Sequence, residues 1–323
     1  MAIDREATAR RRRPLTSEEL ERLRQRIDPS AARIGARPLV GGLDTATYRV
    51  TLGRGAATND VVVRIYREYE HDAAEAVRRE FAALTAVSAA TVLAPKPLLA
   101  DASGEIIGDP LLVMSFFPGA PLPPNADADA EAWVQQMADG LVAVHRTPLD
   151  QLPAGFRRGE TPGERVARIV SQPPKKSDAL WDKVAAILPR AAQGVIANAS
   201  TLIHGDYWFG NTIWLDGRLT GIIDWDGARI ADPALDVSIA RNDIIVFSGP
   251  PMADLFLDRY EQVRGQLASL VFWDLVACLP PIKWLAGWVE GYQELGVDLP
   301  LPDARTRLEA WVENVLARLD GVA

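Results

Sequence analysis

Polar side chains capable of catalysis gather in one short stretch of the sequence, between residues 202 and 226. Apolar residues that favour strands lie on both sides of them. Buried or half-buried carboxylates need a cation or hydrogen-bond donors nearby, because otherwise they take up a proton. The residues concerned are His204, Asp206, Asn211, Asp224 and Asp226.

A magnesium ion fits this set of side chains. Mg2+ is a hard cation that binds one or two protein carboxylates, an amide oxygen and the phosphates of a substrate. Asn211 and Asp224 are suitable ligands for it. Asp206 lies five residues before Asn211, so it can share their loop and accept the proton of an attacking hydroxyl.

Three motifs follow one another in this region. They are His204-Gly-Asp206-x-x-x-x-Asn211, then Ile-Ile-Asp224-Trp-Asp226, then Asp232-Pro-x-x-Asp236. This ordered combination, preceded by a strand-rich segment, resembles the aminoglycoside phosphotransferase family over roughly residues 38–320. The resemblance implies a protein-kinase-like fold. It also implies transfer of the γ-phosphoryl group of ATP or GTP, with Mg2+, to a hydroxyl of a small molecule.

The resemblance also implies a role for each motif residue. Asp206 corresponds to the catalytic base, and Asn211 and Asp224 correspond to the Mg2+ ligands. His204 corresponds to a structural support of the loop, and Asp236 to a side chain that braces it through hydrogen bonds. For Asp226 two roles stay open: assistance to the metal, or a solvated acid in the loop.

The resemblance implies that a strand-rich segment over residues 38–117 binds the nucleotide. Its pattern predicts five strands and one helix at 72–88. Gly41 and Gly42 form the turn between the first two strands, where such folds cover the phosphates. The resemblance pairs a cation on the third strand with a helix glutamate. That cation is Arg64 instead of the protein-kinase lysine, and its candidate partner is Glu80.

The connection between the two predicted lobes is the next candidate for nucleotide binding. Val113 to Phe117, followed by Pro-Gly, matches the family's hinge, where backbone groups bind adenine. Ser115, Phe116 and Phe117 would contact the base there, with Met114 at the rear of the pocket. After Pro118 the pattern is mainly helical. We therefore expect an α+β protein with a five-stranded antiparallel sheet and one helix, followed by a larger helical lobe over residues 118–323 that holds the acceptor.

Composition limits the function classes. The chain has 323 residues, 48% of them hydrophobic, and a net charge of -8, which argues against nucleic-acid binding. Its one cysteine, Cys278, excludes an internal disulfide framework. Residues 1–37 form a basic tail and a helix with no function that the sequence explains. The apolar stretch 270–289 contains charges and a Pro-Pro pair, so we expect a buried helix pair, no membrane span and a cytoplasmic protein.

Other function classes fit the sequence less well. A protein kinase needs a long activation segment, but only seven residues separate Asp224 from Asp232. A serine hydrolase needs a Gly-x-Ser-x-Gly elbow, which the sequence lacks. The remaining alternative is a nucleotide-binding regulatory protein or pseudokinase without turnover.

Aromatic residues of the helical lobe are candidate walls of the acceptor pocket, although core packing explains most such stripes. An aromatic wall would suit a quaternary ammonium or a flat ring. The candidates are Trp273, Trp284, Trp288, Tyr292 and Trp311.

Overall fold

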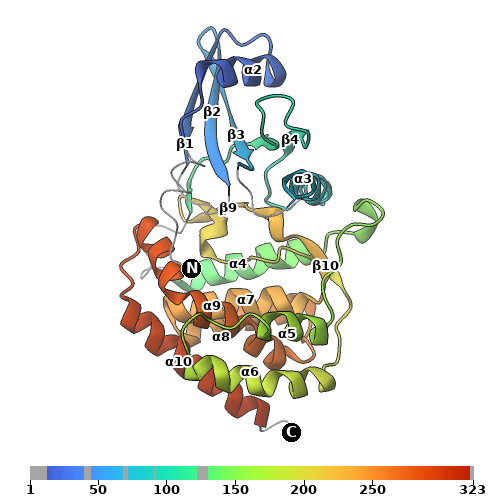
Figure 1. Ribbon diagram of the computed structural model, residues 1–323, viewed down its shortest axis with the longest axis vertical. Coiled ribbons are helices and arrows are strands. Elements are labelled where there is room, and N and C mark those ends of the chain that lie inside the picture. The colour runs from blue at the N-terminus through green and yellow to red at the C-terminus, as the bar shows by residue number, and fades with distance from the viewer. Residues whose placement is uncertain (1–12, 40–44, 68–71, 91, 122–129, 321–323) are drawn as a thin grey trace.

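The computed structural model describes residues 13–39, 45–67, 72–90, 92–121 and 130–320. A five-stranded sheet lies at one end of the molecule and a larger helical part at the other (Figure 1). The sheet has the order β1-β2-β3-β5-β4, and every neighbouring pair is antiparallel. The predicted α+β fold with a five-stranded antiparallel sheet is therefore confirmed. The strands are β1 (Arg33–Pro38), β2 (Ala46–Arg54), β3 (Ala57–Ile65), β4 (Pro97–Asp101) and β5 (Leu111–Ser115).

The first strand differs from the sequence prediction. We expected strands from about residue 37 onward, but β1 begins at Arg33 and ends at Pro38. It is an edge strand that pairs only with β2, and its side chains are almost all exposed. The alternation of apolar and polar residues that marks a half-buried strand is therefore missing from it.

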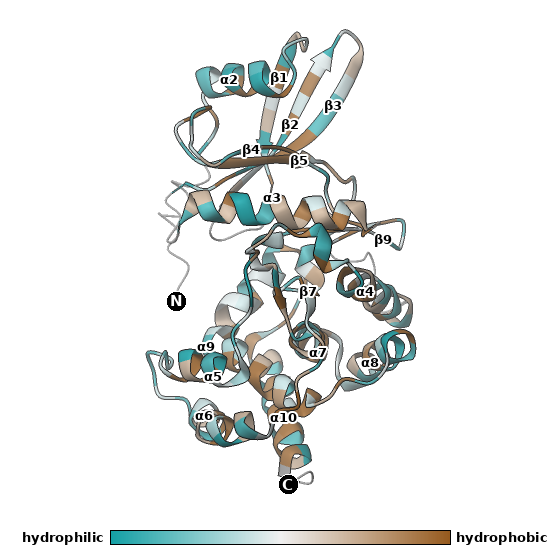
Figure 2. Cartoon of the chain, turned by 90° about the vertical axis from the view of Figure 1, so that its right-hand side faces the viewer, coloured by the Kyte–Doolittle hydropathy of each residue, from teal (hydrophilic) through white to brown (hydrophobic). Residues whose placement is uncertain are grey.

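Two helices cover the sheet. Helix α2 (Ser17–Ile27) begins with a capping box between Thr16 and Glu19 and buries Leu23 against the sheet. Helix α3 (Ala73–Ala89) starts at the cap residue Asp72. Its buried face consists of alanine, valine and leucine side chains, and Glu80 lies in the same face. Figure 2 shows α3 between the sheet and the helical part.

Short strands carry the catalytic segment in the helical part. Strand β7 (Thr201–Ile203) pairs with β10 (Arg229–Ala231), and β8 (Thr212–Leu215) pairs with β9 (Arg218–Ile222) and with β6 (Ala120–Pro121). Asp216 and Gly217 turn the β8–β9 hairpin, both with positive φ. These pairs fix the ends of two loops, which are named here for their predicted roles: the catalytic loop, residues 204–211, and the metal loop, residues 223–228.

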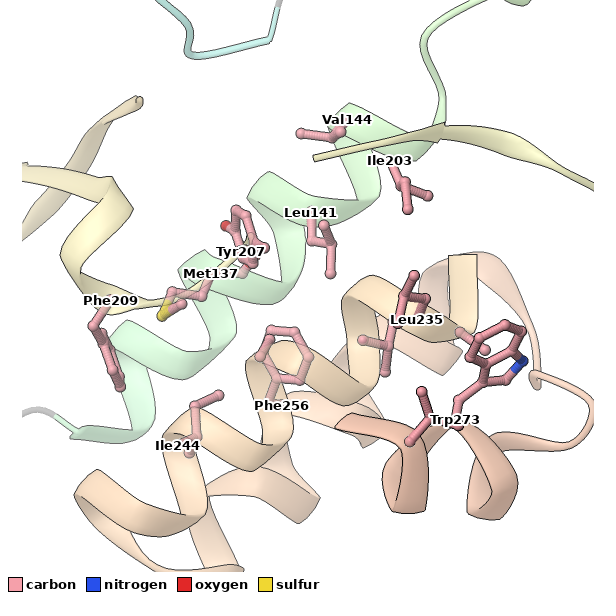
Figure 3. Close-up of a cluster of buried hydrophobic side chains, with 14 of the residues drawn as sticks. Met137, Leu141, Val144, Ile203, Tyr207, Phe209, Leu235, Ile244, Phe256 and Trp273 are labelled. Atoms are coloured by element: carbon pink, nitrogen blue, oxygen red, sulfur yellow. The ribbon is translucent and has the colours of Figure 1, made fainter. Parts of the chain in front are cut away.

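Helices surround these strands. They are α4 (Ala130–His145), α5 (Pro162–Val170), α6 (Ala179–Ala191), α7 (Pro233–Ser248), α8 (Pro250–Arg264), α9 (Leu270–Glu294) and α10 (Leu301–Asp320). Figure 3 shows how α4, α7 and α8 bury Met137, Leu141, Ile244 and Phe256 together. Tyr207 and Phe209 of the catalytic segment point into the same cluster, so the packed core holds that segment in place.

The prediction of a helix pair over the apolar stretch 270–289 was wrong. Helix α9 is a single helix of 25 residues with Pro280 and Pro281 inside it. It packs against α6, α7 and α10. Length and composition would let α9 cross a membrane, but it is largely buried inside the protein, as the core helix of a globular protein is. Helix α6 ends at Ala191, soon after Pro189.

Candidate active site

A cavity of about 450 Å3 lies between the sheet and the helical part. The predicted residues Arg64, Glu80, Met114, Ser115, Phe116, Phe117, Asp206, Asn211 and Asp224 all line it. They come from β3, α3, β5 with the segment after it, and the loops around β8 and β9. Gly41 and Gly42 lie outside the described residues, but Leu39 and Thr45 on either side of them line the cavity.

The catalytic loop starts where β7 ends. Gly205 has a φ of +85, and a Cβ atom at this position would lie 2.3 Å from the carbonyl oxygen of Gly227. Only glycine fits such a left-handed, close contact. Asp236 of α7 accepts hydrogen bonds from the backbone N–H groups of His204 (2.6 Å) and Gly205 (2.7 Å). His145 lies against the same carboxylate at 3.2 Å. These bonds hold the backbone immediately before Asp206.

Asp206 and Asn211 are held against each other. The side-chain amide of Asn211 donates to both the backbone oxygen and Oδ2 of Asp206, each at 2.8 Å. Asp206 opens toward the cavity, yet the protein around it displaces much of the water near its carboxylate. This desolvation raises the pKa of Asp206, and the negative charge of Asp224 adds to the rise. An effective general base has a pKa near the working pH, and the rise brings the pKa of Asp206 closer to that range.

Both ring nitrogens of His204 contact backbone groups of the protein, so neither is placed to transfer a proton to a ligand. Its Nε2 lies 2.9 Å from the carbonyl oxygen of Ile223, and its Nδ1 accepts from the backbone N–H of Asp206 at 3.3 Å. The ring packs edge-on against Trp225 and Tyr207. The imidazole therefore joins the catalytic loop to the metal loop.

Arg64 links three separate elements at the centre of the site. Its Nη1 lies 3.0 Å from Oε1 of Glu80 on α3 and 2.6 Å from Oδ1 of Asp224, while Nε donates to Oγ1 of Thr45 at 3.1 Å. Burial alone would lower the pKa of the Arg64 guanidinium. The charges of Asp224 and Glu80 outweigh it and raise that pKa well above its usual value.

Asp224 follows β9 with a left-handed backbone (φ 65, ψ 68), which is uncommon for a residue other than glycine. The conformation turns the chain sharply, so that the Asp224 side chain reaches the cavity. Such strain persists where the surrounding structure holds it, often at functional sites.

Asp226 is paired with Arg79 and is therefore not a solvated acid of the loop, while its assistance to the metal stays a prediction. Arg79 of α3 donates to its backbone oxygen at 3.0 Å and forms an ion pair with its carboxylate. The Asp226 side chain is 22% exposed. It therefore ties the metal loop to the helix that carries Glu80.

The oxygen ligands at the site are few, so they fit a cation that takes its remaining ligands from substrate and water. Within the described ranges there is no group of three or more His, Cys, Asp or Glu side chains that could hold a metal. What the cavity offers is the carboxylate of Asp224 and the amide oxygen of Asn211. Mg2+ commonly uses such a small set together with substrate phosphates.

The far end of the cavity is formed by α9 and the catalytic loop, and it is largely apolar. Trp288 and Tyr292 line it as the sequence suggested, together with Gly287, Gly291 and Leu295. Trp273 and Trp311 are buried core residues. Trp284 is not among the lining residues and has the Lys283 ammonium 4.8 Å from its ring centre. Core packing therefore explains Trp273 and Trp311, and Trp284 is a half-buried residue outside the cavity.

Trp208 is a lining residue that the sequence reasoning missed. Its indole lies so close to Gly210 that a Cβ there would come within 2.2 Å of the ring. It also packs edge-on against Tyr292, with 5.5 Å between ring centres. An aromatic residue two positions after Asp206 was visible in the sequence, but its contact with α9 was not.

Asp243 of α7 is a second residue that the sequence reasoning missed. It is 1% exposed, and it accepts hydrogen bonds from the Tyr292 hydroxyl and from the backbone N–H of Phe209 (3.3 Å). Burial raises the pKa of Asp243 to about 7, despite these two donors. Asp243 thus connects the catalytic loop with the wall formed by α9.

The Asp243→Asn variant should remove a pH dependence of stability. The folded-state pKa lies above the unfolded value of 3.8, so ionised Asp243 is disfavoured in the folded protein. Its contribution to the free energy of unfolding is full below about pH 4 and falls by about 1.4 kcal/mol per pH unit up to about pH 7. Denaturant unfolding should therefore show the wild type losing stability relative to Asp243→Asn over this range. Asp254→Asn, at an exposed acid, is the control; a pH-independent difference for Asp243→Asn would contradict the assignment.

Comparison with known proteins supports the same family. The sequence model of the phosphotransferase enzyme family matches residues 35–270. Viomycin phosphotransferase of Streptomyces vinaceus is 31% identical over 159 residues, covering 45% of this chain and 54% of that protein. N-acetylmuramate/N-acetylglucosamine kinase of Caulobacter vibrioides is 28% identical over 205 residues, covering 58% of this chain and 54% of that protein. The chain thus spans about half the length of these curated relatives.

A solved structure extends the likeness over nearly the whole chain. It is a thermostable mutant of an aminoglycoside phosphotransferase in a ternary complex with ADP and hygromycin B. Its TM-score is 0.61 at 17% identity, and the match covers 91% of this chain and 97% of that one. This likeness shows the fold. The family match, which takes in most of the residues, shows that this protein belongs to the phosphotransferase enzyme family.

Proposed function

We propose that this protein transfers the γ-phosphoryl group of ATP or GTP to a hydroxyl of a small molecule. One observation carries the proposal: Arg64 of the sheet converges on one cavity with Asp206, Asn211 and Asp224 of the helical part. The relatives are named phosphotransferases or kinases, and one structural neighbour holds ADP. A kinase-like reaction needs this combination of a base, metal ligands and a phosphate-binding cation.

The nucleotide lies, in this proposal, between the sheet and the catalytic loop. The segment 38–117 forms the nucleotide lobe and 118–323 the acceptor lobe. The Ser115 amide already donates to the Lys96 carbonyl oxygen at 2.9 Å, so base recognition falls to backbone groups at Phe116 and Phe117. Val62 and Met114 would pack on the base, and residues 41 and 42 would cover the phosphates.

The residues of this chain would then divide the work. Arg64 binds the phosphates, and Glu80 holds the Arg64 side chain in place. Asn211 and Asp224 would hold Mg2+, which when bound neutralises charge on the phosphates. Asp206 orients the acceptor hydroxyl and takes its proton. The loop stays fixed through Asp236, so the rate gain comes mostly from positioning and charge stabilisation.

The acceptor would occupy the end of the cavity formed by Trp208 and α9. This end has aromatic walls, with Asp206 at its base and Glu294 among its lining residues. An amine-bearing or flat-ringed hydroxyl compound suits it best. The relatives are named for viomycin and for N-acetylmuramate and N-acetylglucosamine, so a family name does not fix the acceptor. We also infer a cytoplasmic protein, because the reaction uses nucleoside triphosphate.

Adding bulk on α9 should block the acceptor without affecting the nucleotide. Gly291 faces the cavity, and a Cβ there would meet nothing within 4 Å. Gly291→Leu should raise the KM of an acceptor by about tenfold or more, since it fills space that the acceptor needs. Gly291→Ala is the matched control and should stabilise the helix by about 0.5–1 kcal/mol. An unchanged acceptor KM in Gly291→Leu, with nucleotide affinity also unchanged, would place the acceptor elsewhere.

A panel of hydroxylated compounds tests the proposal as a whole. Purified protein with Mg·ATP or Mg·GTP is incubated with aminoglycosides, macrolides, choline-like alcohols, sugars and nucleosides, and ADP or GDP release is followed. Acceptor-dependent release is the expected result. A thermal shift with Mg·ATP is the first step, because a ligand of the native state raises the unfolding midpoint. Tight nucleotide binding without transfer to any compound would favour the regulatory alternative.

A further inference from the structure

A group of arginines lies behind the catalytic loop, outside the cavity described above. The central member is Arg229 of β10, which is 8% exposed. Its Nη1 donates to the carbonyl oxygen of Gly227 at 2.6 Å. The same nitrogen would lie 2.5 Å from a Cβ on Gly205. Arg229 therefore touches both the loop before Asp206 and the loop after Asp224.

Arg229 has no carboxylate partner within the part of the chain that the structure describes. No Asp or Glu oxygen of that part lies within 4.0 Å of its guanidinium. A buried arginine without a direct ion-pair partner is unusual, because taking a charge out of water is costly unless another charge or donor replaces it.

A second arginine lies nearby, and its positive charge is also poorly compensated. Arg165 of α5 has a side chain that is 13% exposed, and its buried Nε has no hydrogen-bond partner. Its only carboxylate neighbour within ion-pair distance in the described ranges is Glu160, at 3.6 Å. That carboxylate is already bound by Arg168, at 2.5 and 2.9 Å. Glu160 therefore cannot neutralise Arg165 fully.

The surroundings add positive charge. The segment before α5 runs beside β10, since Ile230 donates to the carbonyl oxygen of Arg157 at 2.9 Å and Gly159 donates to that of Ile230 at 2.8 Å. The side chains of Arg157 and Arg158 are exposed along this segment. Two other acids lie nearby: Glu164 is committed to the capping box with Thr161 at the start of α5, and Asp236 accepts from the backbone N–H groups of the loop before Asp206.

The electrostatics agree with the geometry. Burial, together with the positive charges of Arg229 and Arg168, lowers the pKa of Arg165 to about 9, and the carboxylates of Glu160 and Asp236 do not offset this lowering. Burial also lowers the pKa of Arg229; the negative charge of Asp236 opposes this lowering without reversing it, and the positive charge of Arg157 adds to it. Two buried guanidinium groups thus repel each other where a bound anion would stabilise both.

We propose that Arg165 and Arg229 form a binding site for a small oxyanion, such as inorganic phosphate, behind the catalytic loop. A planar guanidinium presents paired N–H donors that match the oxygens of a phosphate. The anion supplies the negative charge that Glu160 alone does not, and it accepts from donors that the protein leaves free. Because Arg229 also contacts Gly227 and Gly205, a bound anion stabilises the two loops that carry the catalytic and metal-binding residues.

The test measures phosphate binding away from the nucleotide site. The unfolding midpoint is followed against inorganic phosphate, with saturating Mg·AMP-PNP to block the phosphate positions of the cavity and with KCl at matched ionic strength as reference. The wild type should show a rise with phosphate beyond that with KCl, following the mass-action dependence of a native-state ligand. If phosphate and KCl act alike, the site does not exist.

Two variants with opposite expected effects locate the site. Arg165→Met keeps the aliphatic stem and should weaken phosphate binding by at least about tenfold, as the loss of a charge-assisted hydrogen bond does. Glu160→Gln removes the one competing carboxylate and should tighten binding by about tenfold. Arg190→Met, at an exposed arginine outside the group, is the control and should match the wild type. Equal phosphate affinity in Glu160→Gln and Arg190→Met would overturn the proposal, even if Arg165→Met failed to fold.

Discussion

Replacing Asp206 by alanine is expected to lower kcat at least about 100-fold while nucleotide binding persists. The magnitude is that of lost general base catalysis, which contributes about 10²–10⁴-fold. The side chain opens into the cavity, and the hydrogen bond that it accepts from Asn211 lies within one loop. Its removal should therefore leave the fold and the nucleotide lobe intact. Steady-state turnover and calorimetric titration with Mg·ATP measure the two quantities.

Asp206→Asn separates loss of the base from loss of shape. Asparagine keeps the size of the side chain but cannot take a proton at neutral pH. We expect kcat to fall as far as in Asp206→Ala, with both variants unfolding at about the wild-type midpoint. Near-normal turnover in either variant would show that another group accepts the proton.

Replacing Arg64 by alanine has the second large expected effect, on both binding and stability. The affinity for Mg·ATP should fall by about 10- to 100-fold, since charge-assisted hydrogen bonds to the phosphates are lost. The free energy of unfolding should also drop by about 3–5 kcal/mol, because the 1% exposed side chain of Glu80 loses its cation. Calorimetry and denaturant unfolding report the two effects separately.

Arg64→Lys tests whether charge or shape matters at this position. A lysine keeps one positive charge but cannot reach Glu80, Asp224 and Thr45 through a planar fork, as Arg64 does. We expect it to recover most of the stability and only part of the nucleotide affinity. If Arg64→Ala bound Mg·ATP as tightly as the wild type, Arg64 would be a purely structural ion-pair partner.

The catalytic segment could be predicted from the sequence because its chemistry is local. Asp206 and Asn211 lie in one loop, and their spacing alone brings them together. The pairing of Arg64 with Glu80 was also expected, although it joins a strand to a helix, because the family resemblance fixed both positions. The fold class followed from strand and helix patterns that are strong in the core strands.

Contacts between distant segments were the part that sequence could not supply. Arg79 meets Asp226 across 147 positions of the chain, and no pattern in either segment indicates the other. Asp243 looks like any acid on a helix until burial and Tyr292 give it a partner. The bounds of the exposed edge strand β1 and the continuity of α9 were not predicted for a related reason. In both, pairing and packing overrode weak local signals.

The most direct test of the proposed reaction is to observe the transferred phosphoryl group by 31P NMR. The wild type and Asp206→Asn are each incubated with Mg·ATP and an acceptor from the panel. In the wild type we expect a new phosphomonoester resonance that grows in step with ADP, and in Asp206→Asn we expect nucleotide binding without that resonance. ADP and free phosphate forming together, with no phosphomonoester on any acceptor, would contradict transfer to a small-molecule hydroxyl.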